Sequence, residues 1–472
     1  MLKKIQSNRL VFFTVLFVIV NCVLLANEFF WIGFLPVVLA IVFLAFFSLE
    51  KLLLLITFCT PFSFNLENLD FSGIGMSLPT EPLLFGVLIL FLIKLFSGEK
   101  LKSELLNHPI TYAISFYLLW ITFTIITSEM SLVSFKFLIS RLWFIVSFYF
   151  LGFLLFRDLR NIKKFIWLFV IPLCVVILIT TYKHSLFHFN LESSHLVVYP
   201  FFKDHTRYGA VIAFMLPLVF YLFSVNKRKV IIGGFIVILI LGLVLSFTRA
   251  AWVSLLGALV FAFVLKFRVS FSKFITLAII SGSVLLFSWN SIIMNLEKNT
   301  QDSSSSLRKH VESASNISTD ASNLERINRW NCAIRMFRER PIMGWGPGTY
   351  AFQYAPFQRS NERTIISTNQ GNLGNAHSEF LGPLAESGIL GLLSFLFLML
   401  TVYYKGMQLY YSLGKGESKN LVFFILLALT TYFTHGFLNN FLDTDKLAIP
   451  FWACISILLV VDTYHKKEII QE

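Results

Sequence analysis

Apolar runs that approach membrane-crossing length recur from one end of the chain to the other. A transmembrane helix needs roughly 20 consecutive apolar residues, and about fourteen runs come near that length. Hydrophobic residues make up 56% of the chain and charged residues only 14%, which excludes a soluble globular domain. The runs are continuous, whereas the strands of an outer-membrane barrel alternate apolar and polar residues. We therefore predict an all-α polytopic membrane protein with about 12 to 14 transmembrane helices. The runs lie near residues 10–27, 29–48, 51–64, 82–96, 109–127, 135–156, 163–182, 208–225, 230–247, 250–266, 274–292, 380–404, 420–440 and 448–463.

The basic residues cluster in short connections between these runs, and the chain has a net charge of +13. Lysine and arginine accumulate in cytoplasmic loops, so the clusters predict that both termini are cytoplasmic. Basic loops of this kind face anionic lipid, which makes membrane lipids the expected partner and argues against nucleic acid. The first run is too long for a typical signal peptide and is expected to remain as a helix. The clusters lie near residues 3–4, 100–102, 157–164, 227–229, 268–273, 415–419 and 466–467.

One long polar connection, residues 293–378, is predicted to lie outside the membrane on the opposite side. It opens with a Ser-rich stretch, 301–323, that is too polar to fold by itself. In 324–340, apolar residues recur at helical spacing, which predicts an amphipathic helix that ends at Pro341. The GWGPG that follows, 344–348, predicts a tight turn, because glycine adopts backbone angles that other residues avoid.

The strongest local signal is NAHSEFLGPLAESGILG, residues 375–391, at the start of an apolar run. His377 lies at the predicted water boundary, where an imidazole can act as a base. Glu379 follows it, and Glu386 lies about two turns deeper, where a carboxylate marks a functional or a pairing position. An isolated loop histidine is more often inert, so spacing alone does not establish a catalytic role.

A second signal is a pair of arginines at the predicted outer ends of neighbouring helices. Arg207 precedes one apolar run and Arg249 the next but one, and neither belongs to a cytoplasmic cluster. Guanidinium groups bind phosphate oxygens in bidentate fashion, so a pair aimed at one place can hold a diphosphate. The alternative is that both arginines only anchor helix ends at the membrane interface.

Several motifs are absent from the sequence. It contains no P-loop, no HExxH and no cysteine spacing typical of a metal site. It also lacks paired aspartates on an outer loop that would suggest a metal-held diphosphate. A reaction without a metal or another cofactor is the simpler expectation.

Taken in order, the motifs resemble those of the O-antigen ligase and polymerase superfamily. The resemblance covers roughly residues 200–445 and leaves the first half similar only as a set of membrane helices. It rests on SFTRAAW at 246–252, LERINRW at 324–330, RPIMGWGPGTY at 340–350, NAHSEFLGPLAESGILG at 375–391 and NNFLDTDK at 439–446.

The resemblance implies a lipopolysaccharide-biosynthesis enzyme of the bacterial inner membrane, with a fold related to membrane glycosyltransferases of the C type. Such enzymes transfer a glycan from undecaprenyl diphosphate to an acceptor such as lipid A-core at the periplasmic face, without metal or nucleotide. By the resemblance, His377 activates the acceptor hydroxyl, and Arg207 and Arg249 bind the donor diphosphate. His-Ser-Glu stands at 377–379 where many relatives have His-Asn, which leaves the acceptor open.

Supporting roles are expected for Arg329, Glu379, Glu386 and Asp443, although an interfacial anchor is the more common role for an arginine such as Arg329, and a solvated turn position is the simpler explanation for Asp443. The implied division of the chain has three parts. They are N-terminal transmembrane helices in 1–199, a ligase-like catalytic region in 200–445 that includes the periplasmic loop 293–378, and a last helix with a cytoplasmic tail in 446–472.

Three other functions remain compatible with the motifs. A polymerase of O-antigen or exopolysaccharide uses the same donor, and a protein O-oligosaccharyltransferase uses a hydroxyl side chain as acceptor. A transporter of the lipid-linked glycan binds the same carrier without breaking it, but gives a base at the water boundary no task.

Overall fold

The computed structural model describes residues 15–24, 35–65, 76–287, 321–364, 367 and 374–465. Its described residues are almost entirely helical, and seven of the helices are long and apolar enough to cross a membrane. Four shorter apolar helices accompany them. The prediction of an all-α polytopic membrane protein is confirmed, and each of the fourteen predicted apolar runs contains a described helix. The Ser-rich stretch up to 320 lies outside the described residues.

The seven membrane-length helices are Pro109–Ile126, Ser131–Phe156, Leu159–Ser185, His205–Val225, Arg249–Lys266, Leu381–Ser412 and Asp445–His465. The labelled helices are α2 (Leu35–Phe47), α3 (Leu49–Cys59), α4 (Thr80–Phe96), α5 (Ser103–Leu106), α6 (Pro109–Ile126), α7 (Ser131–Ile145), α8 (Leu151–Phe156), α9 (Leu159–Ser185), α10 (Leu191–Val197), α11 (His205–Val225), α12 (Lys229–Leu245), α13 (Arg249–Lys266), α14 (Phe271–Phe287), α17 (Ala321–Glu339), α18 (Tyr350–Gln353), α19 (Leu381–Ser412), α20 (Glu417–His435) and α21 (Asp445–Val460). The short elements are η2 (Thr60–Phe62), β1 (Phe64–Asn65), β2 (Ser77–Leu78), η4 (Val146–Phe150), η5 (Ala355–Phe357), η6 (Ser360–Glu362) and η7 (Val461–His465). β1 and β2 form one antiparallel pair.

The chain divides into two compact units, Met1–Leu55 and Ile56–Glu472. Of the first unit, the structure describes the helix Val15–Leu24, α2 and the beginning of α3. The second unit holds every residue that the sequence marks as a candidate site. Within it, α19 of the expected catalytic region packs on α6, and α21, the expected last helix, packs on α8, so both contact helices of the N-terminal half.

Helix α21 is the centre of the second unit. All of its residues, from Asp445 to Val460, are buried. A helix that is apolar on every side is stable only when other elements surround it, which is the position that α21 takes against α8, η4 and α20. The aromatic rings of Tyr149 and Phe148 in η4 are also fully buried. This packing fixes the turn that enters α21, and that turn becomes part of the site.

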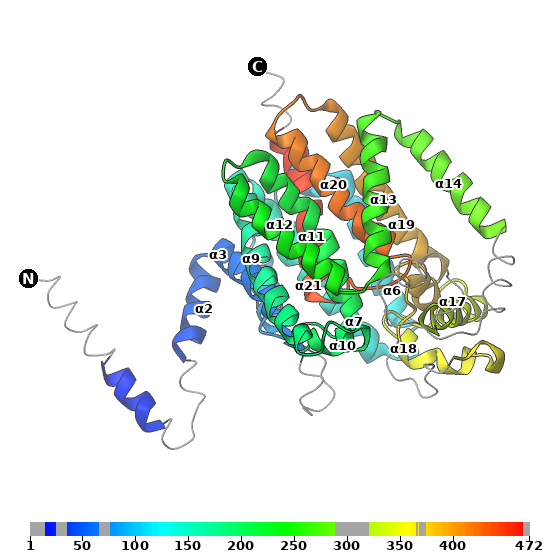
Figure 1. The fold of residues 1–472 in the computed structure, drawn as a ribbon, viewed down its shortest axis with the longest axis horizontal. Coiled ribbons are helices and arrows are strands. Elements are labelled where there is room, and N and C mark those ends of the chain that lie inside the picture. Colours follow the sequence, from blue (N-terminus) through cyan, green and yellow to red (C-terminus); the bar gives the residue numbers. More distant parts are fainter. Residues whose placement is uncertain are drawn as a thin grey trace, which may run out of the picture. The chain divides into compact units, whose positions relative to one another are not determined.

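Three helices, α11, α13 and α20, pack side by side (Figure 1). Helices α11 and α13 both start at the end of the bundle where α20 finishes. This end is called the site end below. Gly209 permits the close approach of α11 to the turn before α13, since a Cβ there would lie 2.9 Å from Thr248 Cβ. Thr248 in turn donates a hydrogen bond to the carbonyl of His205 (3.0 Å).

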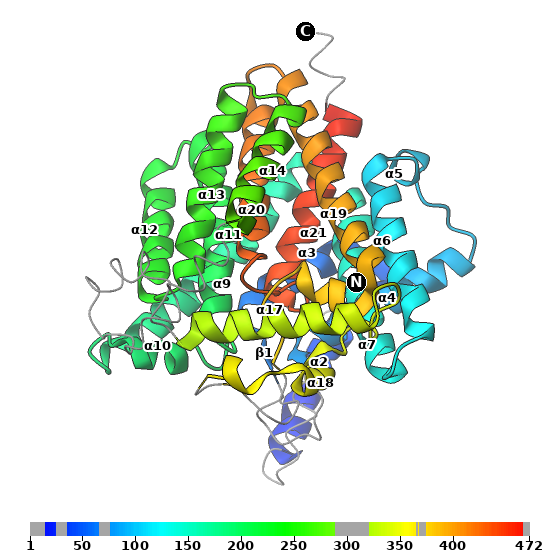
Figure 2. The same cartoon turned by 90° about the vertical axis from the view of Figure 1, so that its right-hand side faces the viewer.

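Helix α17 lies across the site end, transverse to the helices of the bundle (Figure 2). It confirms the predicted amphipathic helix of 324–340. The apolar stripe expected from the sequence, which includes Ile327 and Trp330, is only half-buried. Glu325 and Arg329 lie outside that stripe in the sequence. They are buried instead, because they form an ion pair of 2.6 Å. Their burial requires a tertiary partner that no helical periodicity reveals.

The predicted GWGPG turn docks into a break in α19. Gly344, Gly346 and Gly348 all have positive φ, as the turn requires. α19 departs from helical geometry at Gly388 (φ 70°), and the loop replaces the missing helical hydrogen bonds. Backbone N–H groups of Trp345 and Gly346 donate to the carbonyls of residues 385 and 386 at 3.1 and 2.8 Å. The loop and the start of α19 are therefore held together backbone to backbone.

We expect Gly388→Ala to destabilise the folded protein. Its Cβ would lie 2.0 Å from the carbonyl oxygen of Ile342, at a φ that costs about 1–3 kcal/mol for a residue with a side chain. Gly234→Ala is the matched control, because nothing lies within 4 Å of a Cβ on this glycine of α12. Thermal unfolding in detergent should show a melting temperature lowered by several degrees for the first variant alone. Equal melting of the two variants would contradict the docked break.

Candidate active site

A buried carboxylate joins the two segments that form the site. Glu379 Oε1 accepts hydrogen bonds from the backbone N–H groups of Phe441 (2.8 Å) and Leu442 (3.0 Å), and from the hydroxyl of Tyr432. The N–H of Glu379 itself donates to the carbonyl of Gly436 (2.8 Å). The loop that enters α19 is thereby fixed against the turn between α20 and α21. Glu379 therefore positions backbone, and its carboxylate is already occupied by three donors.

His377 is held beside this turn in a defined orientation. Its backbone adopts φ 47°, and its N–H donates to Asn375 Oδ1 (3.1 Å). Trp330 Nε1 of α17 donates to its carbonyl (3.2 Å). The ring nitrogen Nδ1 lies 3.4 Å from Asn439 Oδ1. An amide oxygen only accepts hydrogen bonds, so the ring carries its proton on Nδ1 and keeps the lone pair of Nε2 as the basic site.

A second histidine stands behind Asn439. The amide nitrogen of Asn439 lies 3.2 Å from Nε2 of His435, the last residue of α20, and donates to it. The same amide thus faces one histidine with its oxygen and the other with its nitrogen. This arrangement requires an unprotonated Nε2 on His435 and so holds that ring in its neutral form. A proton on His377 Nδ1 fits either the neutral or the protonated form of the His377 ring.

The surroundings of His377 oppose its protonation. Burial of the ring and the positive charge of Arg326 lower the pKa of His377 from 6.5 to about 4, against the opposing effect of Asn439. Arg326 lies in α17, and its charge also reaches His435 and His205. His377 is accordingly neutral at physiological pH, in the form that accepts a proton.

Arg207 and Arg249 occupy the first turns of α11 and α13, at the site end. His205 Nδ1 donates to the carbonyl of Ser246 (2.7 Å), which ties the start of α11 to the turn before α13. Both helices therefore present their N-termini, with their partial positive charge, at the same end of the bundle. Each N-terminus is reinforced by an arginine.

Arg207 also lines a small recess, with a volume of about 50 Å³, together with the basic residues Lys203 and Lys446 and the acidic residue Asp445. Its guanidinium lies over the ring of Phe441 (5.4 Å) and 3.4 Å from Asp204. Phe441 belongs to the turn that Glu379 holds, so the recess adjoins the His377 segment across that turn. Arg249 is not among the described residues that line this recess.

A second cavity, with a volume of about 180 Å³, is lined by Asn440 and Asp443 of the same turn. Glu379, Glu386 and Asp443, three of the residues expected to support the site, line it together. The sequence neighbours of His377, Ala376 and Ser378, also line it. The remaining described lining residues include Phe137, Arg141, Gly348, Tyr350, Asn375 and Asn440. The lining mixes charged, polar and apolar side chains, and His377 itself is not among the described residues that line this cavity or the recess of Arg207.

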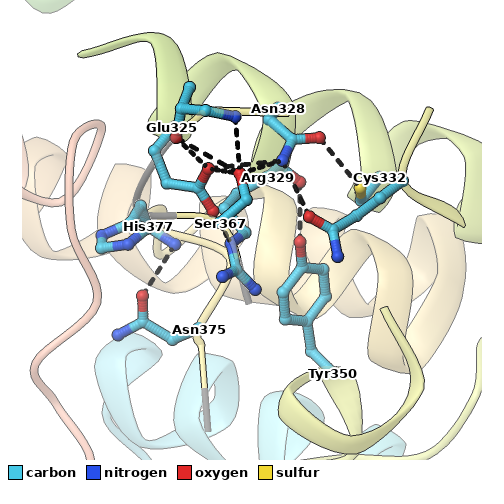
Figure 3. Close-up of polar contacts among 10 residues, drawn as sticks. Glu325, Asn328, Arg329, Cys332, Tyr350, Ser367, Asn375 and His377 are labelled. Atoms are coloured by element: carbon cyan, nitrogen blue, oxygen red, sulfur yellow. Dashed lines mark hydrogen bonds and ion pairs between the residues drawn. The ribbon is translucent and has the colours of Figure 1, made fainter. Parts of the chain in front are cut away.

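Two of the expected supporting residues already have intramolecular partners. Arg329 forms the ion pair with Glu325, and its guanidinium carbon lies 3.8 Å from the ring centre of Tyr354. Glu386 accepts the backbone N–H of Tyr350 (3.0 Å) in the docked loop. Figure 3 shows Glu325 and Arg329 beside the loop that carries His377. Arg329 and Glu386 therefore support the walls of the site.

The carboxylate of Glu325 is strongly bound. Burial alone would raise the pKa of Glu325. The hydrogen bond from Ser367 and the charge of Arg329 outweigh burial and hold this pKa below its ordinary value. Thr364 Oγ1 donates to the same carboxylate (3.0 Å). Tyr350 adds a hydrogen bond from its hydroxyl to the carbonyl of Arg329 (2.7 Å). These contacts hold α17 on the loop, and they keep Arg326 near His377.

Three residues of the site were not singled out from the sequence. Arg141 is buried within the apolar run 135–156, where a charged residue is costly and signals a function or a partner. Its Nη1 donates to the carbonyl of Leu442 (2.8 Å), on the turn that Glu379 also holds. Asn439 and Arg326 lie in motifs that carry the resemblance, but neither was given a role, because their roles depend on residues far away in the sequence.

The fold and the site define a multi-pass α-helical membrane protein with a polar, histidine-containing site assembled at one end of its bundle. Residues 234–396 match the family model described as O-Antigen ligase. The match confirms the predicted resemblance to the O-antigen ligase and polymerase superfamily over these residues, and this family suggests a glycosyl-transferring enzyme and lipopolysaccharide biosynthesis. The matched residues include Arg249 and His377 but neither Arg207 nor Asp443. None of the curated proteins compared with the chain matches it.

We expect His377 to remain neutral well below pH 6. Diethyl pyrocarbonate reacts with neutral imidazole, so its rate of reaction with His377, followed by peptide mass spectrometry, should be half-maximal near the pKa of about 4. Arg326→Gln removes one cause of the lowered pKa and should move this midpoint to higher pH. Arg338→Gln, at an exposed position of the same helix, should leave it unchanged. A midpoint near 6.5 in the parent protein would contradict the proposed environment.

Proposed function

We propose that the protein is a periplasmic-face glycan transferase of the ligase type. It moves a polysaccharide from undecaprenyl diphosphate to a lipid A-core-like acceptor, with no metal in the reaction. The observation that carries this proposal is the pairing of His377 with Asn439, which leaves Nε2 as a free base at the end of the bundle where α11 and α13 begin. A base and an anion-stabilising group are the two functions that this transfer needs.

The proposed step proceeds as a displacement at the anomeric carbon of the donor sugar. His377 Nε2 takes the proton of the acceptor hydroxyl while the hydroxyl oxygen forms a bond to the anomeric carbon. The bond from that carbon to the diphosphate oxygen breaks, and undecaprenyl diphosphate leaves with one additional negative charge. Asn439 keeps the proton on Nδ1 throughout, so that Nε2 faces the acceptor.

The departing diphosphate is assigned to Arg207 and Arg249. Guanidinium groups and helix N-termini both stabilise phosphate charge, and the two arginines stand at the N-termini of α11 and α13. The recess that Arg207 lines adds Lys203 and Lys446 to the positive field. Positive charge already in place stabilises the leaving group without reorganisation during the reaction.

The acceptor is assigned to the cavity beside the histidine loop. Asp443 is exposed at this cavity, and Arg141 lies buried in its wall. A carboxylate binds sugar hydroxyls by accepting their hydrogen bonds, and Asp443 is the cavity carboxylate without the backbone ties of Glu379 and Glu386. The transferred hydroxyl then enters from one side of the 439–443 turn and the diphosphate from the other.

His377→Ala should abolish most glycan transfer. Loss of a general base lowers the rate by about 10²–10⁴-fold. The assay uses the purified protein, undecaprenyl diphosphate-linked oligosaccharide and lipid A-core, with a chelator present throughout. His188→Ala is the matched control, because this histidine is exposed in the loop after α9. Donor binding should be retained in both variants.

The products of the same assay decide between the alternatives. Glycan on lipid A-core, formed in the presence of chelator, supports a metal-independent ligase. Elongated carrier-linked glycan identifies a polymerase, and glycan on a protein hydroxyl identifies an O-oligosaccharyltransferase. If the parent protein leaves the donor unconsumed, the enzyme proposal fails and transport of the carrier lipid gains support.

Asp443→Asn should raise the KM for the acceptor more than it lowers kcat. The substitution keeps the size of the side chain while it removes a charged hydrogen-bond acceptor, which contributes about 1.5–3 kcal/mol, or roughly 10- to 100-fold in binding. Glu192→Gln removes an exposed charge in α10 outside this cavity and should change neither constant. An unchanged KM in Asp443→Asn would remove Asp443 from the acceptor site.

A further inference from the structure

A groove with a basic end and an apolar floor lies at the end of the bundle opposite α17. It is bounded by α13, α19, α20 and the end of α11, and it has a volume of about 450 Å³. Figures 1 and 2 show the connections between α13 and α14 and between α19 and α20 at this end. Its lining includes Leu259, Phe263, Lys266, Lys419, Phe423 and Phe424. No residue of the proposed transfer site lines it.

Polar and apolar residues of the groove are separated along the helix axes. Lys266 is the last residue of α13, and Leu259 lies seven residues earlier, about 10 Å deeper in the bundle. Lys419 lies in the first turn of α20, and Phe423 follows one turn deeper. The groove therefore places its positive charge at the end of the helices and its apolar surface toward their middle. A phospholipid has the same order of charged headgroup and apolar chain.

The positive charge at the mouth is reinforced by its neighbours. The charges of Arg268 and Lys415 act on Lys419, and Lys266 lines the same groove. Among the described residues that line the groove, no side chain is acidic. The neighbouring acid, Glu417, accepts instead from Lys163 and Tyr221, both at 2.8 Å. The positively charged side chains at the mouth of the groove therefore favour binding of an anionic group.

The lysine head is also held in place. Lys419 Nζ donates to the carbonyl of Leu413 (2.9 Å) and lies 4.9 Å from the ring centre of Tyr410. Beside the groove, the rings of Phe263 and Phe267 are 58% and 73% exposed, which is the surface that a lipid chain covers in a membrane helix. The groove is therefore open to the side on which bilayer lipids lie.

We propose that this groove is a binding site for an anionic phospholipid of the bilayer. The phosphate lies between Lys266 and Lys419, and one acyl chain follows the floor formed by Leu259, Phe263 and Phe423. Basic pockets between transmembrane helices bind acidic headgroups in this way. This lipid site lies at the end of the bundle far from His377, so the proposal does not depend on which reaction the protein catalyses.

Native mass spectrometry of the purified protein in detergent tests the site, with phosphatidylglycerol, cardiolipin and neutral phosphatidylcholine as probes. The parent should retain the anionic lipids preferentially. Lys266→Gln combined with Lys419→Gln should weaken that binding by roughly tenfold. Lys100→Gln combined with Lys102→Gln removes the same charge from exposed positions outside the groove and should have no effect.

Ala262→Phe provides a second test that leaves the lysines in place. Ala262 lines the groove, so a larger side chain there should fill the space of the acyl chain and weaken lipid binding. Equal retention of phosphatidylcholine by the parent, or unchanged binding in both groove variants, would overturn the proposal. Displacement of the lipid by glycerol phosphate at equal concentration would show a site for free phosphate and would also overturn it. Thermal unfolding confirms that each variant is folded.

Discussion

The buried carboxylate of Glu379 is the interaction on which the site depends. It joins the loop before α19 to the turn between α20 and α21 through two backbone N–H groups and the hydroxyl of Tyr432. Each buried donor left without an acceptor costs about 1–3 kcal/mol, so removal of this carboxylate destabilises the whole junction. Asn439 faces His377 only because this junction is closed. The orientation of the histidine is therefore a product of packing at a distance from its ring.

Some residues around this junction hold backbone segments in place, and others keep side-chain atoms accessible for binding or proton transfer. Glu379, Glu386 and Arg329 are occupied by backbone groups or by an ion pair, and they hold loop, turn and α17 in place. Among the described residues, none forms such a tie with His377 Nε2 or with the exposed carboxylate of Asp443. This division follows from burial, because a buried charge requires partners and partners restrict what else that charge can bind.

The two ends of the bundle have different electrostatic characters. At the site end, α11 and α13 present N-termini and arginines, and α17 adds Arg326. At the far end, lysines and arginines stand at the connections between α13 and α14 and between α19 and α20. The first arrangement suits a diphosphate held at a defined point, whereas the second suits lipid headgroups at a surface.

The sequence determined the membrane class, each apolar run that contains a helix, the amphipathic α17 and the GWGPG turn, because hydrophobic length, helical periodicity and glycine are local properties. It also marked His377 and the two arginines as candidates. It did not determine which face of α17 is buried, since Glu325 and Arg329 stabilise each other only after folding. The partnership of His377 with Asn439, 62 positions apart, likewise arises from tertiary packing. The tertiary structure alone decided these contacts, because the groups that form them are brought together by helices that pack far from either residue.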